Sequence, residues 1–423
     1  MPSGATHSVG YADTSAAFSI SSNPVVGVFI YRSADGPSGT FTANNVSLSW
    51  NYAQDGVQNT NTVEVRVFAI EMVYIPTGSF FAGDNATSYA SFMQGSSDND
   101  PWYIGSEAAI SVGSQAGTGT GFGEVNSEYY YVTDAYTYDE ATGASFTVPA
   151  AFPKGYNKFY MMKGEVSQGQ WVSFFNTLTT TQKNARDITA ASGKNRDTVY
   201  YRNNISWISG DANLPDQGVG ALYESVAMSY LSWADLVAYL DWAGLRPASE
   251  LEFERAGRGP YRALSGEYAW GNTSVTGATT VTDAGKSSEV GQSDANCVYN
   301  NGVQGPMRVG SMSYGKATRV ESGAGYYGNM DLSGNISERL VTVGNSEGRG
   351  FEGSKHGNGM LTSAGDANVT TWPGTAGTGA GLHGAAWNMA TNDLALSSRT
   401  YAAVPNLAGR SFNRGGRGVR TAP

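Results

Sequence analysis

The sequence predicts an α+β protein with little regular structure, preceded by a small all-β segment. Two helix starts can be read between residues 232 and 259, whereas the recognisable strands are short. Glycine accounts for 55 of the 423 residues and shows no collagen-like period. That is about twice the usual share, and it predicts many turns and irregular loops. Residues 1–68 instead carry the alternating apolar pattern of strands.

Composition excludes several classes of partner. The formal net charge is −10, from 36 acidic and 26 basic residues. Such a charge repels nucleic acid and anionic lipid, so we expect no nucleic-acid partner. No apolar run reaches the length of a membrane span, and we expect none. The single cysteine, Cys297, excludes an intrachain disulfide and a multi-cysteine zinc site, and is expected to be a buried small side chain.

The N-terminal 68 residues read as a sheet or half-sandwich. Strands are predicted at 25–31, 40–50 and 61–70, where β-branched and aromatic residues alternate between Asp-Gly and Asn-rich turns. The segment begins abruptly within a polar stretch, which suggests a larger upstream β domain. We therefore divide the chain into a β-rich segment, 1–68, and a second domain, 69–423.

The second domain opens with an expected hairpin at 71–84, followed at about 84–150 by a Gly-, Ser- and Tyr-rich stretch that reads as a loop-rich insertion. A strand is predicted at Phe159–Met162. Ser167 then caps a helix whose apolar residues share one face. That apolar face comprises Trp171, Phe174, Phe175 and Leu178.

The stretch from Ser232 to Gly259 predicts two capped helices. In each, a serine is followed three residues later by a carboxylate, Ser232 by Asp235 and Ser249 by Glu252, which is the capping-box pattern. The first helix presents an apolar stripe and is expected to end at Gly244. Pro247 prevents its continuation. The stripe comprises Trp233, Leu236, Val237 and Leu240.

Seven motifs in fixed order resemble the formylglycine-generating enzyme, or sulfatase-modifying-factor, family. The resemblance covers about residues 70–423 and implies a C-type-lectin-like α+β fold. Its parts are the Met72–Gly83 hairpin, the Phe159–Trp171 helix entry, the WAGLRPASELEFERAGRG block at 242–259, YAWGN at 268–272, the GNMDLSGNISE segment at 328–338, GAAW at 384–387 and GRGVR at 416–420.

The chain departs from the catalytic pattern of that family. Catalytic members bind copper through two cysteines that follow the GGSW-like strand, and carrying those positions over places Met389 and Leu394 there. A thioether and an isobutyl group cannot ionise, so we expect neither copper nor formylglycine-generating activity. The related sulfoxide synthases need iron-binding histidines, whereas the three histidines here share no ligand spacing, so no iron is expected. These are His7, His356 and His383.

The same resemblance implies a structural calcium in the SGNISE segment. Gly334, Ile336 and Glu338 would be its ligands, with Asn335 or Ser333 nearby, and oxygen donors of this kind suit calcium. The alternative is a capped turn that holds no ion. A second family site would involve Asn296 and the carbonyl of Cys297, although no downstream acidic partner is evident.

In C-type-lectin-like modules the loops around the last strands form the recognition face, and here this implies a ligand-binding face at about Asn388–Arg417. Aromatic, amide and arginine groups are usual in binding faces. The alternative is that the tryptophan belongs to the core and the arginines bond internal carbonyls. The expected residues are Trp387, Asn388, Asn392, Asp393, Arg399, Tyr401, Asn406, Arg410, Phe412, Asn413 and Arg417.

Three functions therefore compete. We expect a non-catalytic extracellular recognition or adhesion module that binds a protein or glycan. The alternatives are a structural subunit of an extracellular fibre, surface layer or phage-like assembly, which binds copies of itself, and an enzyme of unassigned chemistry. No signal peptide follows Met1, so the protein is intracellular or the chain begins after processing. Because the layout resembles secreted bacterial proteins, we expect an extracellular or cell-surface location.

Overall fold

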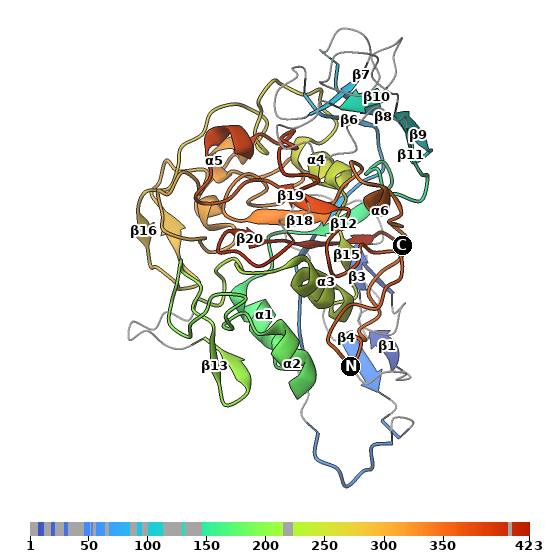
Figure 1. Cartoon of the computed structure of the whole chain (residues 1–423), viewed down its shortest axis with the longest axis vertical. Helices are drawn as coiled ribbons and strands as arrows, with labels where there is room; N and C mark the ends of the chain where they lie inside the picture. The colour runs from blue at the N-terminus through green and yellow to red at the C-terminus, as the bar shows by residue number, and fades with distance from the viewer. Residues whose placement is uncertain are drawn as a thin grey trace.

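The computed structural model describes nearly all of the chain from residue 146 onward, and shorter pieces before it. Short strands and helices are joined by long loops (Figure 1), which confirms the α+β class with little regular structure. The described residues are 7–11, 18–21, 29–32, 46–50, 52–53, 56–63, 67–84, 91–94, 100–112, 129–131, 146–214, 223–404 and 408–423.

Two small sheets form the centre of the molecule. Strand β12 is buried along its whole length, and it lies between β5 and β21 in a sheet of order β15-β21-β12-β5. The second sheet has the order β19-β18-β20. Since β20 and β21 follow one another in the chain, the C-terminus ties both sheets together. Their bounds are β5 (Met72–Ile75), β12 (Phe159–Met162), β15 (Arg246–Pro247), β18 (Ser337–Val341), β19 (Ala380–His383), β20 (Arg414–Gly415) and β21 (Gly418–Thr421).

The helices lie around these sheets, and in the view of Figure 1 α4 lies above β18 and β19 while α3 and α1 lie below. The longest, α3, has only 10 residues. The described helices are α1 (Gln168–Phe175), α2 (Thr180–Arg186), α3 (Trp233–Trp242), α4 (Glu250–Arg258), α5 (Arg319–Ser322) and α6 (Ser346–Arg349), with 3-10 turns η2 (Ser311–Ser313) and η3 (Thr391–Leu394).

The predicted helix pair is confirmed in detail. Both capping boxes are present, at Ser232 and at Ser249, and the apolar stripe of α3 is buried. Gly244 adopts the left-handed φ of 69° expected after a helix end. The Ser167 cap and the buried aromatic face of α1 are also as predicted.

Helix α4 is unusual because charged residues on it are buried. Glu250, Glu252 and Glu254 are each at most 1% exposed. Each meets an arginine, namely Arg399, Arg246 and Arg258 in that order. The helix is therefore fixed in the interior by ion pairs as well as by its apolar side chains.

The described part of the stretch at 84–150 contains strands, and Phe92, Trp102 and Val112 are fully buried in the largest apolar cluster. They share that cluster with the helices, so this part of the stretch contributes to the common core. Strands β7 and β9 to β11 form a sheet of order β11-β9-β10-β7. The bounds are β7 (Phe92–Gln94), β8 (Trp102–Ile104), β9 (Ile110–Val112), β10 (Tyr129–Tyr131) and β11 (Phe146–Val148).

Two strand expectations are corrected. The strands of the expected 71–84 hairpin exist, but β5 pairs with β12 while β6 (Phe80–Ala82) pairs with β8, so they do not form a hairpin. The amide of Gly78 in the turn bonds Tyr156 instead. In the predicted strand at 61–70, the described residues 61–63 and 67–70 are not extended in a sheet. Val67 is 81% exposed there, so this apolar side chain of the predicted strand is not packed against the rest of the protein.

The remaining strands form two-stranded antiparallel ladders. In the N-terminal segment β1 pairs with β4 and β2 with β3, which confirms short strands at the ends of the predicted 25–31 and 40–50 runs. None of the helices in the described part of the chain combines the length and apolar composition that a membrane span requires. The bounds are β1 (His7–Tyr11), β2 (Phe18–Ser21), β3 (Phe29–Arg32), β4 (Val46–Trp50), β13 (Ser206–Ile208), β14 (Asp211–Asn213), β16 (Val281–Thr282) and β17 (Val290–Gly291).

Candidate functional site

The positions of the family's cysteines hold no reactive group. Leu394 is fully buried, and the thioether of Met389 accepts a hydrogen bond from Ser337 Oγ at 3.3 Å. The only thiol, that of Cys297, is buried and donates to the carbonyl of Ser333 at 3.1 Å. Burial raises the pKa of the Cys297 thiol far above its usual value, so it stays protonated.

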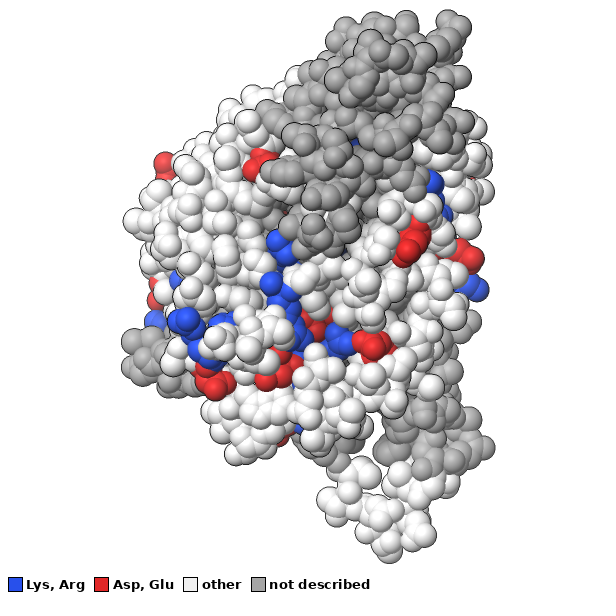
Figure 2. All heavy atoms as spheres, in the orientation of Figure 1, with Lys and Arg blue, Asp and Glu red and all other residues white. Residues whose placement is uncertain are grey.

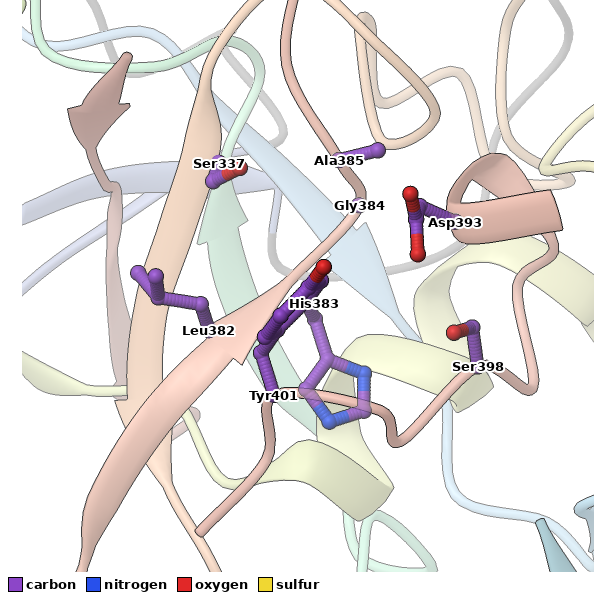
Figure 3. Close-up of a pocket in the computed structure, with 8 residues that line it drawn as sticks. All are labelled: Ser337, Leu382, His383, Gly384, Ala385, Asp393, Ser398 and Tyr401. Atoms are coloured by element: carbon purple, nitrogen blue, oxygen red, sulfur yellow. The ribbon is translucent and has the colours of Figure 1, made fainter. Parts of the chain in front are cut away.

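A small pocket lies beside these positions, at the end of β19 (Figure 3). It has a volume of ≈ 10 Å³, which is about the space that one water molecule needs. Asp393 and Tyr401, both expected in the ligand-binding face, line it together with His383 and Ser398. Burial raises the pKa of the Asp393 carboxyl.

Two polar side chains of this pocket, His383 and Ser398, are not bonded to each other. The imidazole of His383 makes no hydrogen bond to a described residue and lies 3.5 Å from Glu250. The Ser398 hydroxyl pairs with Thr400 at 3.2 Å. Nucleophilic catalysis needs a base in contact with the nucleophile, and Ser398 and His383 do not supply that contact.

Two of the expected ligand-binding arginines are interior ion-pair members. Arg399 is fully buried and its Nε donates to Glu250 at 2.7 Å. Burial alone would raise the pKa of Glu250, but the Arg399 guanidinium and the neighbouring His383 bring it down to about 2. Arg417 is 1% exposed and binds Glu338. Their expected place on an exposed face is wrong, because each neutralises a carboxylate inside the protein.

Arg410 is also held internally. Its guanidinium bonds both carboxylate oxygens of Asp235, at 2.7 and 2.9 Å, and the carbonyls of Asp187 and Ala185. Its side chain is 8% exposed. This pair fastens the C-terminal loop to the start of α3, and leaves little of Arg410 for a ligand.

The remaining expected residues divide into two groups. Trp387, Asn388, Phe412 and Asn413 come together, and the amide of Asn413 donates to Asn388 at 3.2 Å. Trp387 is only 2% exposed, so its expected place on an exposed surface is wrong, although it supports the half-buried residues around it. Asn392 is exposed on η3, beside Asp393. Asn406 lies outside the described residues.

Tyrosines from another part of the chain complete this group. The Tyr201 ring packs against both Trp387 and Phe412, with ring centroids 5.2 and 4.8 Å away, and the Tyr200 ring centroid lies 4.4 Å from that of Tyr201. Tyr200, Tyr201 and Phe412 are half-buried. The exposed guanidinium of Arg196 lies 3.9 Å from the Tyr200 ring. We call Tyr200, Tyr201, Trp387 and Phe412 the Tyr201 cluster.

The backbone at Tyr201 is strained. Tyr200 and Asn203 exchange two hydrogen bonds of 3.0 Å, so Tyr201 and Arg202 are the central residues of a tight turn. Both have left-handed φ angles, 45° and 61°. Turns of this kind favour Asn and Gly, and a bulky residue there costs free energy. Strain retained in this way is typical of functional positions.

Sequence reasoning missed Tyr200 and Tyr201 because they lie in a polar stretch at 179–220 that reads as a linker. The one available signal is the Tyr-Tyr-Arg run itself, which places large rings in otherwise polar surroundings. The packing partners Trp387 and Phe412 lie about two hundred positions further along the chain, so no local pattern reveals the pairing.

The residues implied for calcium are already occupied. Both oxygens of Glu338 accept hydrogen bonds from Arg417, at 2.6 Å each. Asn335 Oδ1 accepts from the Met307 amide at 2.7 Å, and the Gly334 carbonyl accepts from the Ile336 amide. A guanidinium bound to the only carboxylate ligand repels a second cation. The residues present therefore do not fit a calcium ion in the SGNISE segment.

The second implied site does not fit either. Asn296 Oδ1 accepts from the Thr276 amide at 2.8 Å, its Nδ2 donates to Val320, and the Cys297 carbonyl accepts from Ala278. Within the described ranges, no three His, Cys, Asp or Glu side chains gather as metal ligands.

Comparison with known proteins agrees with the motifs. The profile of the sulfatase-modifying factor enzyme 1-like domain matches residues 137–366, more than half of the chain. Treponema denticola variable protein 1 is 13% identical, with a TM-score of 0.37 over 86% of this chain and 99% of that one. The structure of CarF is 12% identical, with a TM-score of 0.28 over 74% of this chain and 98% of that one.

No curated protein matches the chain. The family match ends at residue 366. Tyr200 and Tyr201 therefore lie within the matched range, whereas Trp387 and Phe412 lie beyond it. The match covers the four motifs at 159–171, 242–259, 268–272 and 328–338, and it confirms the family resemblance there. The chain belongs to the sulfatase-modifying factor enzyme 1-like domain family.

Proposed function

We propose that this chain is a non-catalytic recognition module that binds a protein or glycan ligand at the Tyr201 cluster. The observation that carries the proposal is Tyr201 itself, a half-buried aromatic ring held in a strained turn and stacked on two further rings. The fold keeps a costly conformation that presents this ring. Aromatic side chains of this kind dominate the energetics of binding surfaces.

The surroundings of the cluster suit binding without catalysis. Asn388 and Asn413 place amide groups beside the rings, and Arg196 adds an exposed cation beside Tyr200. On the face shown in Figure 2, basic and acidic side chains lie next to one another across the middle, and further charged side chains are scattered toward the edges. Recognition at the cluster would rest on stacking by its rings and on hydrogen bonds to the amides of Asn388 and Asn413.

The absence of catalysis is part of the proposal. It is supported by Met389 and Leu394 at the cysteine positions and by the protonated, buried Cys297. Copper-loaded protein incubated with a cysteine-containing sulfatase peptide should produce no aldehyde. Aldehyde formation would contradict this part of the proposal.

A binding screen tests the recognition function. The full chain is applied to an array of defined glycans and to a panel of purified extracellular protein domains, together with Tyr201→Asn. Asparagine tolerates the left-handed turn, so this variant removes the ring and keeps the backbone. The matched control is Tyr261→Asn, because Tyr261 is 61% exposed and lies outside the cluster.

Selective binding that is lost in Tyr201→Asn and kept in Tyr261→Asn would support the proposal. Binding unaffected by Tyr201→Asn, or no binding to any member of either collection, would contradict it. Light scattering on the same samples tests the assembly alternative, since concentration-dependent growth of particles would favour a structural subunit.

The proposal includes an extracellular or cell-surface location, which rests on the resemblance in layout to secreted proteins. Protease treatment of intact producing cells should degrade the chain. Full protection, with degradation after lysis, would contradict this location.

A further inference from the structure

The buried side chain of Arg417 fills a complete oxygen cage. Its five N–H groups meet five hydrogen-bond acceptors. Two are the carboxylate oxygens of Glu338, at 2.6 Å each. The others are the carbonyl oxygens of Met330 at 2.7 Å, Lys163 at 3.1 Å and Met162 at 3.3 Å. We call these five oxygens the Arg417 cage.

The cage has the chemistry of a hard-cation site. One bidentate carboxylate and several backbone carbonyls are the donor types that calcium takes in proteins. Family resemblance assigns Glu338 to calcium as its only acidic ligand. Here that carboxylate is only 1% exposed and is paired at both oxygens with a guanidinium.

The buried charge of Glu338 requires a cation beside it. The carboxyl groups of Glu165 and Asp331 lie within electrostatic reach of Glu338 and Arg417. Burial raises the pKa of Glu165, which favours its neutral form. Asn335 donates a hydrogen bond to Glu165 Oε1, and the Gly310 amide donates to Asp331. Removing the guanidinium would leave the Glu338 carboxylate buried and uncompensated, which is strongly destabilising.

The position of the cage explains what the cation stabilises. The carbonyls of Met162 and Lys163 come from the end of β12, Glu338 comes from β18, and Arg417 lies between β20 and β21. The guanidinium therefore joins the two central sheets at one point. A divalent ion bound by the same oxygens would make the same connection.

We propose that the guanidinium of Arg417 is the resident cation of this cage, in place of the calcium that the family resemblance implies, so that the fold needs no divalent cation here. The chain carries its own positive charge on a side chain. Its stability and its recognition surface are then independent of calcium.

Thermal unfolding tests the proposal. The full chain, Arg417→Ala and Arg420→Ala are each unfolded with EGTA, with calcium chloride, and with guanidinium chloride far below denaturing concentrations, against sodium chloride of equal ionic strength. Arg420 is the matched control because it follows on β21, is half-buried and donates to the Gly244 carbonyl at 2.6 Å, outside the Arg417 cage.

We expect EGTA and calcium to leave the Tm of the unsubstituted chain unchanged. Arg417→Ala should unfold at a lower temperature, and guanidinium or calcium should restore part of the loss because either cation enters the vacated cage. Neither cation should raise the Tm of Arg420→Ala.

Two results would overturn the proposal. One is a fall in the Tm of the unsubstituted chain with EGTA that calcium reverses. The other is an Arg417→Ala protein that neither cation stabilises. If Arg417→Ala does not fold, Arg417→Lys replaces it, since an ammonium keeps the charge but cannot meet all five oxygens. The Tm of Arg417→Lys should then lie below that of the unsubstituted chain and should not change with EGTA. A Tm equal to that of the unsubstituted chain would contradict the proposal.

Discussion

Replacing Arg399 by methionine should destabilise the protein strongly at neutral pH and much less in acid. Arg399 and Glu250 are both fully buried, and the Glu250 oxygens also accept hydrogen bonds from the Thr342 hydroxyl at 2.9 Å and the Val343 amide at 2.6 Å. Arg399→Met leaves Glu250 as a buried carboxylate without its guanidinium. Breaking a buried pair in this way costs about 3–5 kcal/mol.

The pKa of Glu250 gives an independent magnitude for what the ionised carboxylate contributes to stability in its folded surroundings. It falls from 4.5 to about 2 in the folded protein, and at about 1.4 kcal/mol per pH unit this corresponds to about 3 kcal/mol. Because the folded pKa is depressed, this stability is present above pH 4.5 and is lost as the pH falls from 4.5 toward 2. The pair therefore acts at full strength at neutral pH.

In Arg399→Met the pH dependence that Glu250 gives to stability is reversed. Burial, the largest influence on Glu250, is no longer opposed by Arg399, and although the neighbouring His383 still lowers the pKa of Glu250, that pKa should rise. The variant then loses stability as the pH rises through that raised pKa, so its deficit against the unsubstituted chain should shrink between pH 7 and pH 4. The double variant Glu250→Gln/Arg399→Met should be more stable at pH 7 than Arg399→Met alone.

Urea unfolding at pH 7 and pH 4 measures these differences. The control is Arg262→Met, which removes the exposed ion pair with Asp100, where the side chains are 57% and 52% exposed. Exposed pairs contribute at most about 1 kcal/mol. A deficit for Arg399→Met below that of the control, or one equal at both pH values, would refute the reasoning.

Two further predictions concern the scaffold. Ser249→Ala should lower the free energy of unfolding by about 1–2 kcal/mol, because Ser249 caps α4 and donates to Pro153 at 2.7 Å. Thr179→Ala, which removes the same kind of cap from the more exposed α2, should cost less in urea unfolding, and an equal cost would contradict the role of burial. Cys297 should react with a thiol reagent only as the protein unfolds, since its thiol is buried and protonated. Rapid labelling with unchanged circular dichroism would contradict that placement.

The features that the sequence predicted are those with local causes. The caps at Ser232 and Ser249 and the stripe of α3 depend on residues at most eight positions apart, and they formed as predicted. By contrast, strand pairing depends on distant partners. Strand β6 pairs with β8 rather than with β5, and apolar alternation at 61–70 could not reveal that its described residues, 61–63 and 67–70, join no sheet.

The candidate site was predictable only in part, for the same reason. The C-terminal loops were expected to contribute aromatic and amide groups, and Asn388, Phe412 and Asn413 do lie together. Arg399 was expected on the recognition face because the family's last loops form it, and the sequence could not reveal its partner Glu250, which lies 149 residues away. Tyr201 could not be assigned because its conformation is set by the turn and not by its own preference.

Recognition at the Tyr201 cluster is tested most directly by measuring two quantities on one variant. For the ligand found in the screen, Tyr201→Asn should raise the Kd at least tenfold, which is about 1.4 kcal/mol, while its free energy of unfolding stays near that of the unsubstituted chain because the strained turn is relieved as the stacked ring is lost. Tyr261→Asn should change neither quantity. A Kd that Tyr201→Asn leaves unchanged, or that both variants raise equally, would contradict the assignment of this cluster as the binding site.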